Sequence, residues 1–445
     1  MRLRHVMAAV TPVGAASALA ILPLGTSVAP SAAAVAGHMT PAVAAPHAYA
    51  YIGKAGSAPA ASGFLFSCQE PGAALNCYTP QELATAYDIP ANLTGAGQTI
   101  VIVDAFGDPT IAQDVAAEDS VFGLPAANLN VIYPDGQPAF DPTNADEVNW
   151  TGEIALDVES AHAIAPSAKI DLVIAKSDAD ADIASAIQYA VSHHLGNVLS
   201  QSFGEAESCE ATSIVNRDHA QYLSAQAKNM TVFASSGDDG AAQPTCDGSS
   251  YIKSAGIPAS DPLVTGVGAT SLTAAQPAGT YESETAWNDE YGSSGGGYST
   301  LFKRPAFQNG IAQSTYRGVP DVAYSGDVNN GLLVAWSGGD PTQVGTFYLF
   351  GGTSAGSPQW AAITALADQK NGHPVGYIND KLYSLARSSQ YNYVFHDITS
   401  GDNTVSLVDS NNNPVNITGF AAVKGWDPVT GLGTPNVAHL LQFLK

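Results

Sequence analysis

Short apolar segments of strand length alternate with helical segments in the first half of the chain. The candidate strands cover residues 99–106, 169–175, 197–204 and 231–236. The candidate helices cover residues 153–163, 181–194 and 213–228. Strands that are apolar throughout are typically buried on both faces, and strands separated by helices are typical of a parallel sheet. We therefore predict an α/β fold with a mainly parallel central sheet flanked by helices.

The length of 445 residues would allow two or three domains. Neither a charged or proline-rich linker nor an internal repeat follows residue 90. We therefore expect one large domain over residues 78–445. In sheets of this kind, functional sites gather at the carboxyl ends of the strands.

The N-terminal region has the features of a targeting segment followed by a loose extension. Two arginines precede an apolar, alanine-rich run, and Ala34 and Ala36 supply the small residues of a cleavage site. We predict a signal peptide over residues 1–36 and a secreted, extracellular protein without a membrane span. Residues 37–77 are rich in alanine, proline, glycine and serine, which indicates a short leader or N-terminal extension.

Four cysteines suit an oxidising destination. Three pairings are possible for four cysteines. We favour Cys68 with Cys77 and Cys209 with Cys246, because the members of each pair are close in the sequence.

Acidic side chains outnumber basic ones by 40 to 16, which gives a formal net charge of −24. Such a chain would be repelled by nucleic acid and by anionic membranes, so neither is expected as a partner. Near pH 4 carboxylates approach their ordinary pKa values of about 3.9 to 4.3, and the net charge falls toward zero. Few basic residues also limit the cationic repulsion that promotes acid denaturation. Adaptation to acid and an ordinary acidic composition fit these numbers equally well.

The segment GEIALDVES places two carboxylates four residues apart in an otherwise apolar helical run. Glu153 and Asp157 therefore share one helix face, whereas Glu159 points about 120° away. Two like charges at this spacing destabilise a helix, and burial of the pair raises the pKa of at least one of them. Either this face is exposed to solvent, or the repulsion serves a function.

A candidate nucleophile is Ser354, which opens an apolar helix after a Gly-Gly turn in FGGTSAGSPQWAAITALADQ. A serine at this place is most often a helix N-cap. Alternatively, its hydroxyl attacks a carbonyl while its backbone N–H, at the positive end of the helix dipole, faces the forming oxyanion. The longer string G-T-S-A-x-x-P favours the nucleophile, because subtilisins and their acid-acting relatives share it.

Subtilisins also require a histidine in an H-G-T-H string, and none of the ten histidines lies in one. They further place an asparagine in the oxyanion hole, where this chain has Asp238 in TVFASSGDDGAA. Together the strings E-x-x-x-D, S-S-G-D and G-T-S-A-x-x-P resemble the sedolisins, the serine-carboxyl peptidases. The resemblance continues through SQSFG, SGGGYSTLFKRPAFQ, RGVPDVA and GWDPVTGLGTP, and covers nearly everything from Tyr78 to the C-terminus.

The resemblance implies a subtilisin-like single catalytic domain over residues 78–445 and a serine-type endopeptidase that acts on proteins or peptides in acid. It assigns the nucleophile to Ser354, the general base to Glu153, and the orientation of that base to Asp157. A glutamate base can work at about pH 4, where a histidine would be protonated. Asp238, neutral in acid, would donate to the oxyanion as another neutral carboxylic acid does in ketosteroid isomerase. Asp239 is the alternative donor. We expect a monomer.

By the same resemblance, a calcium site lies near the C-terminus. Asp397 and Asp427 would supply carboxylates, and the carbonyls of Ile398, Val423 and Gly425 would complete the set with water. The family usually has glycine where this chain has Val423.

The resemblance also implies a peptide-binding edge. Its residues would be Ser202, Phe203, Gly204, Ser236 and Gly237. An extended peptide can pair with such a backbone edge.

One departure concerns the N-terminus, because most sedolisins carry a large folded pro-domain and residues 37–77 are too few to form one. Two other hypotheses therefore stay open. One is a neutral subtilisin-like peptidase that uses Asp104, a histidine such as His162, and Ser354. The other is a secreted binding protein on an inactive peptidase scaffold.

Overall fold

The computed structural model describes residues 40–41, 49–56, 64–70 and 72–445. The predicted signal peptide over residues 1–36 lies outside the described residues. Within the described ranges, no helix has both the length and the apolar character needed to cross a membrane.

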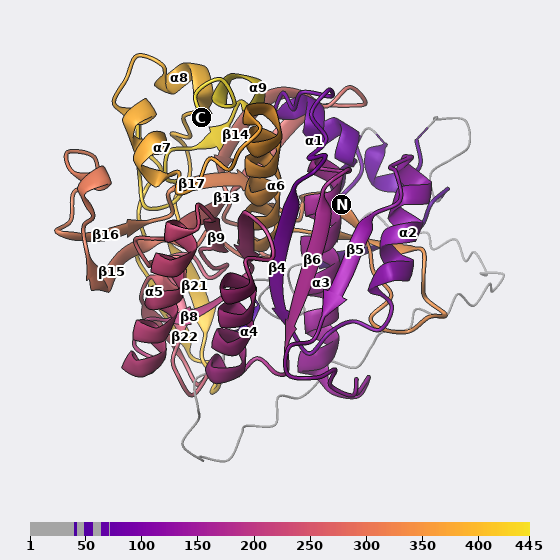
Figure 1. Cartoon of the computed structure of the whole chain (residues 1–445), viewed down its shortest axis with the longest axis horizontal. Coiled ribbons are helices and arrows are strands. Elements are labelled where there is room, and N and C mark those ends of the chain that lie inside the picture. The colour runs from indigo at the N-terminus through magenta and orange to yellow at the C-terminus, as the bar shows by residue number, and fades with distance from the viewer. Residues whose placement is uncertain (1–39, 42–48, 57–63, 71) are drawn as a thin grey trace, which may run out of the picture. The chain divides into compact units, whose positions relative to one another are not determined.

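A mainly parallel sheet forms the centre of the described chain, with the strand order β14-β13-β9-β7-β4-β6-β5 and β17 also paired to β13 (Figure 1). Its strands are β4 (Thr99–Ala105), β5 (Asn128–Ile132), β6 (Lys169–Ala175), β7 (Val198–Gln201), β9 (Thr231–Ser235), β13 (Thr265–Ala275), β14 (Thr280–Ala286) and β17 (Val322–Ser325). Neighbouring strands run parallel, except for the antiparallel pair β13 and β14. The predicted sheet is therefore confirmed.

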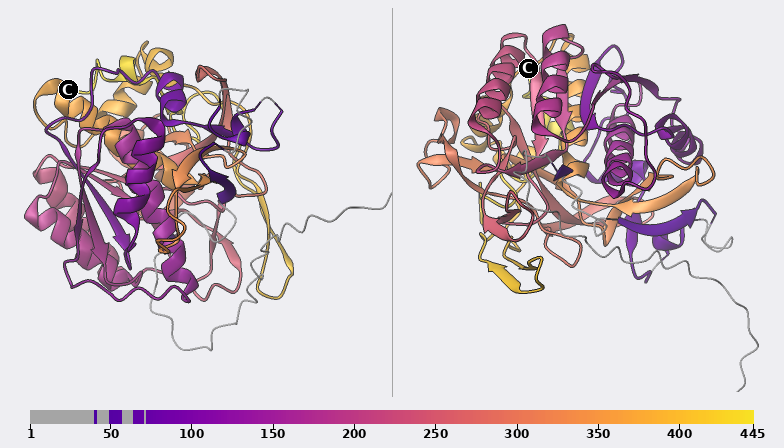
Figure 2. Two further views of the ribbon diagram at one scale, coloured as in Figure 1. Left: turned by 90° about the vertical axis from the view of Figure 1, so that its right-hand side faces the viewer. Right: turned by 90° about the horizontal axis from the view of Figure 1, so that it is seen from below.

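Helices cover both faces of this sheet. In chain order, the first six α-helices of the described residues are α1 (Pro80–Ala86), α2 (Ile111–Phe122), α3 (Ala145–Ile164), α4 (Asp180–His193), α5 (Thr212–Ala227) and α6 (Thr353–Asn371). Side chains alternate along β4: Ile100 and Ile102 join the core that contains α3 and α6, whereas Val101 and Val103 join the core that contains α4 and α5. Figures 1 and 2 show α4 and α5 next to each other on one face. This period of two between buried faces explains why the strands are apolar throughout.

A second, four-stranded sheet has the order β2-β19-β18-β3. Its strands are β2 (Tyr49–Lys54), β3 (Asn76–Tyr78), β18 (Asn330–Ala335) and β19 (Thr346–Phe350). The region 37–77, for which the sequence predicts loose structure, thus contributes two strands to this sheet, β2 and most of β3. Tyr49 stacks on Phe350 and meets Trp336 edge-on, so aromatic contacts distant in the sequence hold β2 in place. The domain boundary at residue 78 stays a prediction.

The predicted strand over residues 197–204 is divided in two at Ser202, where β7 ends and β8 begins. The remaining strands are β1 (Thr40–Pro41), β8 (Phe203–Ala206), β10 (Ala242–Pro244), β11 (Tyr251–Lys253), β12 (Gly256–Ile257), β15 (Gly297–Lys303), β16 (Tyr316–Val319), β20 (Phe395–His396), β21 (Val405–Val408), β22 (Pro414–Ile417) and β23 (Thr434–Pro435). The remaining helices are α7 (Asn379–Ala386), α8 (Tyr391–Val394), α9 (Val437–Leu440) and the 3-10 turns η2 (Ser67–Gln69) and η3 (Ala306–Gln308).

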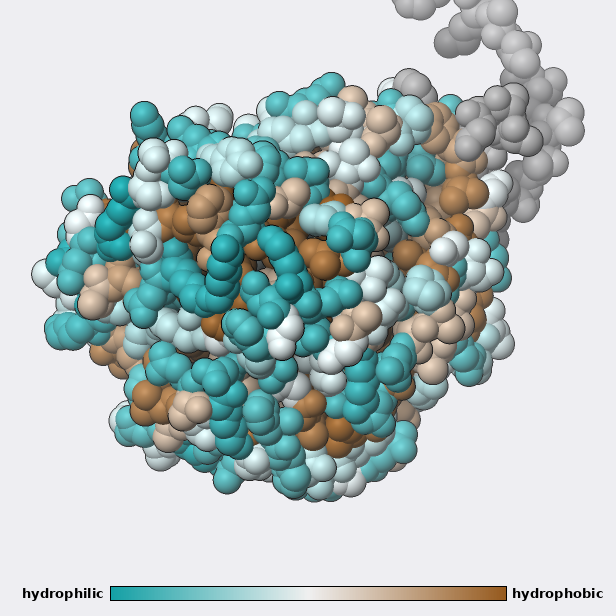
Figure 3. All heavy atoms as spheres, turned by 45° about the horizontal axis from the view of Figure 1, so that its top comes forward, coloured by the Kyte–Doolittle hydropathy of each residue, from teal (hydrophilic) through white to brown (hydrophobic). Residues whose placement is uncertain are grey.

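Both favoured disulfides are present, Cys68–Cys77 and Cys209–Cys246. The face in Figure 3 is covered largely by hydrophilic side chains, with apolar ones in small scattered groups. Most large apolar side chains of the described residues lie instead in the two cores against the central sheet.

Candidate active site

The candidate residues gather where three adjacent parallel strands end. Asp104 lies near the end of β4, Ser202 follows β7, and Asp238 follows β9. These strands are neighbours in the order β9-β7-β4, so their carboxyl ends share one edge of the sheet. This is the edge at which parallel sheets usually place their sites.

Helix α3 brings two buried carboxylates to Asp104. The side chains of Glu153, Asp157 and Asp104 are each 0% exposed. Burial raises the pKa of Asp157 well above its ordinary value, and the charges of Asp104 and Glu153 raise it further. The Ser202 hydroxyl acts in the opposite direction and lowers the pKa of Asp157. The hypothesis of a solvent-exposed helix face is therefore wrong.

Asp104 also has a strongly shifted pKa. Burial raises it to about 8. In acid, Asp104 and Asp157 are therefore protonated, which lets this group of three carboxyls stay buried without full mutual repulsion.

Ser354 lies in the first turn of α6, after a tight glycine turn. Gly352 has φ of +95°, and a Cβ on Gly351 would lie 2.4 Å from the carbonyl oxygen of Gly326, so both positions favour glycine. The N-cap of α6 is Gly352, not Ser354, so the N-cap hypothesis for this serine is wrong. The Ser354 Oγ is buried and has no hydrogen-bond partner among the described residues.

Asp238 is tied directly to the start of the same helix. Its Oδ1 accepts hydrogen bonds from the Thr353 backbone N–H at 2.8 Å and from the Thr353 hydroxyl at 2.9 Å. The turn before it is supported by Gly295, whose N–H donates to the Gly237 carbonyl at 2.7 Å. A carboxyl is thus held beside the residue that precedes the candidate nucleophile.

The two helices that carry these groups pack against each other. At Gly152, next to Glu153, an added Cβ would lie 3.4 Å from the Phe350 ring. Phe350 ends β19, four residues before Ser354. The structure therefore brings the carboxylates of α3 and the serine of α6 to one region.

The predicted peptide-binding edge is largely a backbone edge. The side chains of Ser202, Phe203 and Ser236 are buried, and the Ser236 hydroxyl donates to the Gly295 carbonyl at 2.7 Å. The backbone of β1 pairs antiparallel with Phe203 and Gly204. An extended peptide strand can therefore pair with this edge, as residues 40–41 do.

His162 is not part of this group. It lies near the end of α3 and is buried, with its Nε2 2.9 Å from Asp119 Oδ1 and 2.9 Å from the Pro125 carbonyl oxygen. His162 is therefore a buried residue near the end of α3, and its Nε2 contacts Asp119 and the Pro125 carbonyl.

The carboxylates predicted to bind calcium lie close to the predicted backbone segment. Asp397 Oδ1 accepts from the Gly425 N–H at 2.9 Å and from the Tyr391 hydroxyl at 3.0 Å, and Asp427 Oδ2 accepts from the Val423 N–H at 2.9 Å. In the part of the chain described here, neither carboxylate forms an ion pair with a basic side chain. Hard oxygen donors without a cationic partner suit calcium chemically.

The side chains of this region cannot supply all the ligands of a calcium site. Among the described residues, no three His, Cys, Asp or Glu side chains are grouped to hold a metal. Backbone carbonyls such as that of Ile398, or water, would have to supply the other ligands. Gly425 has φ of +82°, whereas Val423 is not among the residues with positive φ, so valine is compatible with the backbone there.

Two residues of the site did not follow from the motifs. The motifs place Asp104 only in a histidine-based scheme, although its position near the end of a buried strand is itself a signal. Thr353 is part of G-T-S-A, but only the fold reveals that it contacts Asp238.

Comparison with known proteins supports one assignment. The sequence model of the Subtilase family matches residues 145–393 of the chain. Kumamolisin from Bacillus sp. (strain MN-32) is 37% identical over 397 residues, which cover 85% of this chain and 66% of kumamolisin. Tripeptidyl-peptidase 1 from Mus musculus is 31% identical over 276 residues, which cover 56% of this chain and 43% of that protein. The chain thus spans less than two thirds of the length of these relatives.

A solved structure is similar over most of the fold. It is Pseudomonas sedolisin, a serine-carboxyl proteinase complexed with two molecules of pseudo-iodotyrostatin. The TM-score is 0.71 at 27% identity, with coverage of 84% of this chain and 99% of that chain.

Proposed function

The chain belongs to the subtilase family and, within it, to the sedolisins, and on this premise we propose that it is a secreted, acid-acting serine endopeptidase. The observation that carries the proposal is a group of three buried carboxyls: Asp104 on β4 meets Glu153 and Asp157 on α3, the helix that packs against the helix of Ser354. A buried carboxylate can serve as general base at a pH where histidine is protonated.

The proposed reaction begins when the Ser354 Oγ attacks the carbonyl carbon of the scissile peptide bond. Glu153 takes the hydroxyl proton and later gives it to the leaving amine, so the C–N bond breaks and an acyl-enzyme remains. Protonated Asp157 holds Glu153 by sharing its proton. Neutral Asp238 and the Ser354 N–H stabilise the oxyanion. Water, with Glu153 again as base, then releases the acid product and restores Ser354.

The substrates proposed are proteins and peptides bound in extended form at the edge formed by residues 202–204 and 236–237. Endopeptidase action is proposed from the sequence resemblance, and release of tripeptides is the alternative, because tripeptidyl-peptidase 1 is also among the relatives. Secretion is supported by the two disulfides and by the sequence of residues 1–36. The protein is proposed to act as a monomer.

The activity of the secreted protein on a denatured protein substrate, measured between about pH 2.5 and 8, tests this proposal. We expect a maximum at about pH 3 to 5 and no activity above about pH 6, because the base must be ionised while Asp238 stays neutral. The Glu153→Gln variant, which keeps the shape but not the base, should be inactive throughout. Blocked and unblocked peptides of equal length distinguish endopeptidase from tripeptidyl action.

Two results would contradict the proposal in different ways. A rate that rises toward pH 7 or 8 and is lost in His162→Ala would support a histidine base with Asp104. Failure to hydrolyse any substrate in acid, with calcium present and the leader trimmed, would support a binding protein on an inactive scaffold.

We also propose a calcium ion at Asp397 and Asp427, whose charge would offset the two carboxylates there. Removal of calcium with EGTA is expected to lower the unfolding temperature by several degrees, since loss of a ligand that binds only the native state destabilises it. Asp397→Asn should remove most of this dependence on calcium. An exposed acid, in the variant Asp146→Asn, serves as the control. An unfolding temperature that is indifferent to both calcium and EGTA would exclude the site.

A further inference from the structure

Thr353 contacts the proposed oxyanion donor through two different groups. Its backbone N–H and its hydroxyl both lie within 2.9 Å of the same carboxyl oxygen, Oδ1 of Asp238. Thr353 is 0% exposed and Asp238 is 4% exposed, so water does not compete freely for these bonds. Hydrogen bonds in such surroundings are strongly directional constraints.

The direction of the hydroxyl bond is fixed by a third group. The Gly237 N–H donates to the Thr353 Oγ1 at 3.0 Å, which occupies a lone pair of that oxygen. The hydroxyl proton then points at Asp238 Oδ1. This oxygen also accepts a hydrogen bond from the Thr353 backbone N–H, so it acts as an acceptor toward both groups. The three groups form a chain that runs from Gly237 through Thr353 to Asp238.

We propose that Thr353 is a positioning residue that determines which oxygen of Asp238 carries the proton. Oδ1 accepts two hydrogen bonds, and a proton on it would point toward other protons. The acidic proton of neutral Asp238 must therefore reside on Oδ2, which fixes the direction in which Asp238 can donate. The inference rests on the proposed function, since it concerns how the oxyanion donor is oriented.

The surroundings of Asp238 bear on its titration. Asp239 is its titratable neighbour in the same turn, and burial raises the pKa of Asp239 to about 6. From α6, Thr353 and Ser354 supply only neutral groups. From the loop before β15, the Ser293 N–H donates to the Asp238 main-chain carbonyl at 2.7 Å. A hydrogen bond donated to a carboxyl favours its ionised form, so loss of the Thr353 hydroxyl should raise the pKa of Asp238.

The test compares Thr353→Val, which keeps shape and backbone N–H but lacks the hydroxyl, with Thr353→Ser, which keeps the hydroxyl. For Thr353→Val we expect kcat on a peptide substrate to fall by about tenfold to a hundredfold, with KM changed less than about threefold. The alkaline limb of its pH profile should move to higher pH. Thr353→Ser should restore most of the turnover and the position of that limb. Thr353→Ala is the second hydroxyl-free variant, should valine disturb folding.

A double-mutant cycle separates this role from a merely structural one. In an Asp238→Ala background, Thr353→Val should have little further effect on kcat, because it acts through Asp238. Hydroxyl-free variants with wild-type kcat and an unmoved alkaline limb would overturn the inference while the proposed function stood. If the wild type is active in acid and the Asp238→Ala variant is equally active, Asp238 is not the oxyanion donor, and the inference about Thr353 fails with it. A wild type inactive at every pH would overturn the proposed function as well.

Discussion

Replacement of Ser354 by alanine is expected to reduce peptide hydrolysis by at least about 10³-fold and to leave the stability of the fold nearly unchanged. The first effect follows from loss of the attacking oxygen. The second follows from the surroundings of that oxygen, because the Ser354 Oγ is buried without a hydrogen-bond partner among the described residues. Its removal therefore costs no hydrogen bond within this part of the protein. The measurement is kcat/KM at the pH optimum together with the thermal unfolding temperature.

A serine one turn further along α6 provides a matched control. The Ser357 hydroxyl is buried and lies 2.8 Å from the Ser200 hydroxyl on β7. Ser357→Ala should leave the catalytic rate near that of the wild type but lower the stability by about 1 to 3 kcal/mol, because Ser200 loses its buried partner. Ser354→Ala should thus lose activity and keep its stability, whereas Ser357→Ala should lose stability and keep its activity. A stable Ser354→Ala protein with full activity would exclude Ser354 as the nucleophile.

The strands and helices around the site were largely predictable because each carries its own local signal. The strand over residues 169–175 is β6 without any change of bounds, and the helix expected over 181–194 is α4 to within one residue at each end. Helix α3 begins earlier than expected, at Ala145, where the Asn144 side chain caps it by accepting from the Asp146 N–H. The helical spacing of Glu153 and Asp157 sufficed to place both on one face.

Contacts between segments distant in the sequence could not be predicted in this way. Tyr49 and its strand lie almost 300 residues before the aromatic rings that hold them, so their short pattern resembles a linker. Asp104 joins Asp157 only because β4 lies in the middle of the sheet beneath α3. The local sequence pattern determines which face of its helix or strand a residue occupies. The order of the strands in the sheet determines which other residues contact that face.

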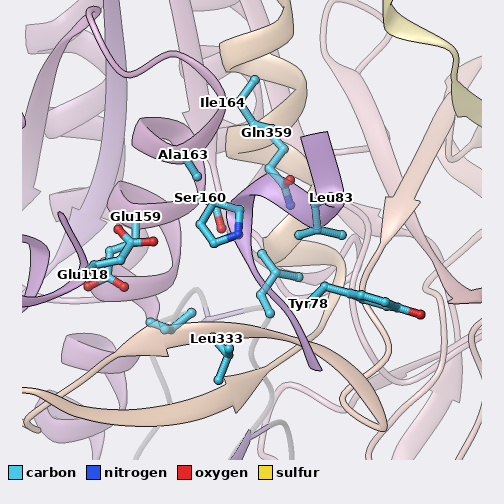
Figure 4. Close-up of a pocket in the computed structure, with 12 residues that line it drawn as sticks. Tyr78, Leu83, Glu118, Glu159, Ser160, Ala163, Ile164, Leu333 and Gln359 are labelled. Carbon is cyan, nitrogen blue, oxygen red and sulfur yellow. The ribbon is translucent and has the colours of Figure 1, made fainter. Parts of the chain in front are cut away.

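A second group of buried acids lies on another face of α3, beside the pocket of Figure 4. Glu159 of α3 and Glu118 of α2 line this pocket, and Figure 4 shows their carboxyl groups close to each other. Both side chains are at most 2% exposed. The Ala335 N–H of β18 donates to Glu159 Oε2 at 2.8 Å, whereas Glu159 Oε1 and Glu118 Oε2 have no hydrogen-bond partner in the described structure.

The neighbours of this pair offer little charge compensation. Asp114 and Asp119 approach it from α2, and the basic group nearby, His162, is bound to Asp119. Gln359 of α6 and the apolar residues of β18 that line the pocket are neutral. Burial raises the pKa of Glu118 and of Glu159 well above the ordinary value, and the charge of each neighbouring acid adds to the shift.

These shifts predict a fold that loses stability as the pH rises. Above the ordinary glutamate pKa, the unfolded chain has released protons that the native protein still holds, so the free energy of unfolding falls with pH. The loss is up to about 1.4 kcal/mol per pH unit for each such group. It begins near pH 4.5 and continues until the native carboxyls themselves ionise. Below that range both states are protonated and the contribution is fully present.

The double variant Glu118→Gln/Glu159→Gln is therefore expected to flatten the decline of the unfolding temperature between about pH 4.5 and 8. Glutamine resembles the protonated acid and can still accept from the Ala335 N–H, but it has no proton to lose. The double variant Glu282→Gln/Glu290→Gln removes the same net charge from two exposed positions and should retain the wild-type decline. Equal slopes in all three proteins would show that this acid pair does not limit stability above acid pH. A flatter slope in the buried variant alone would mean that the fold, as well as the proposed chemistry, depends on carboxyls that stay protonated.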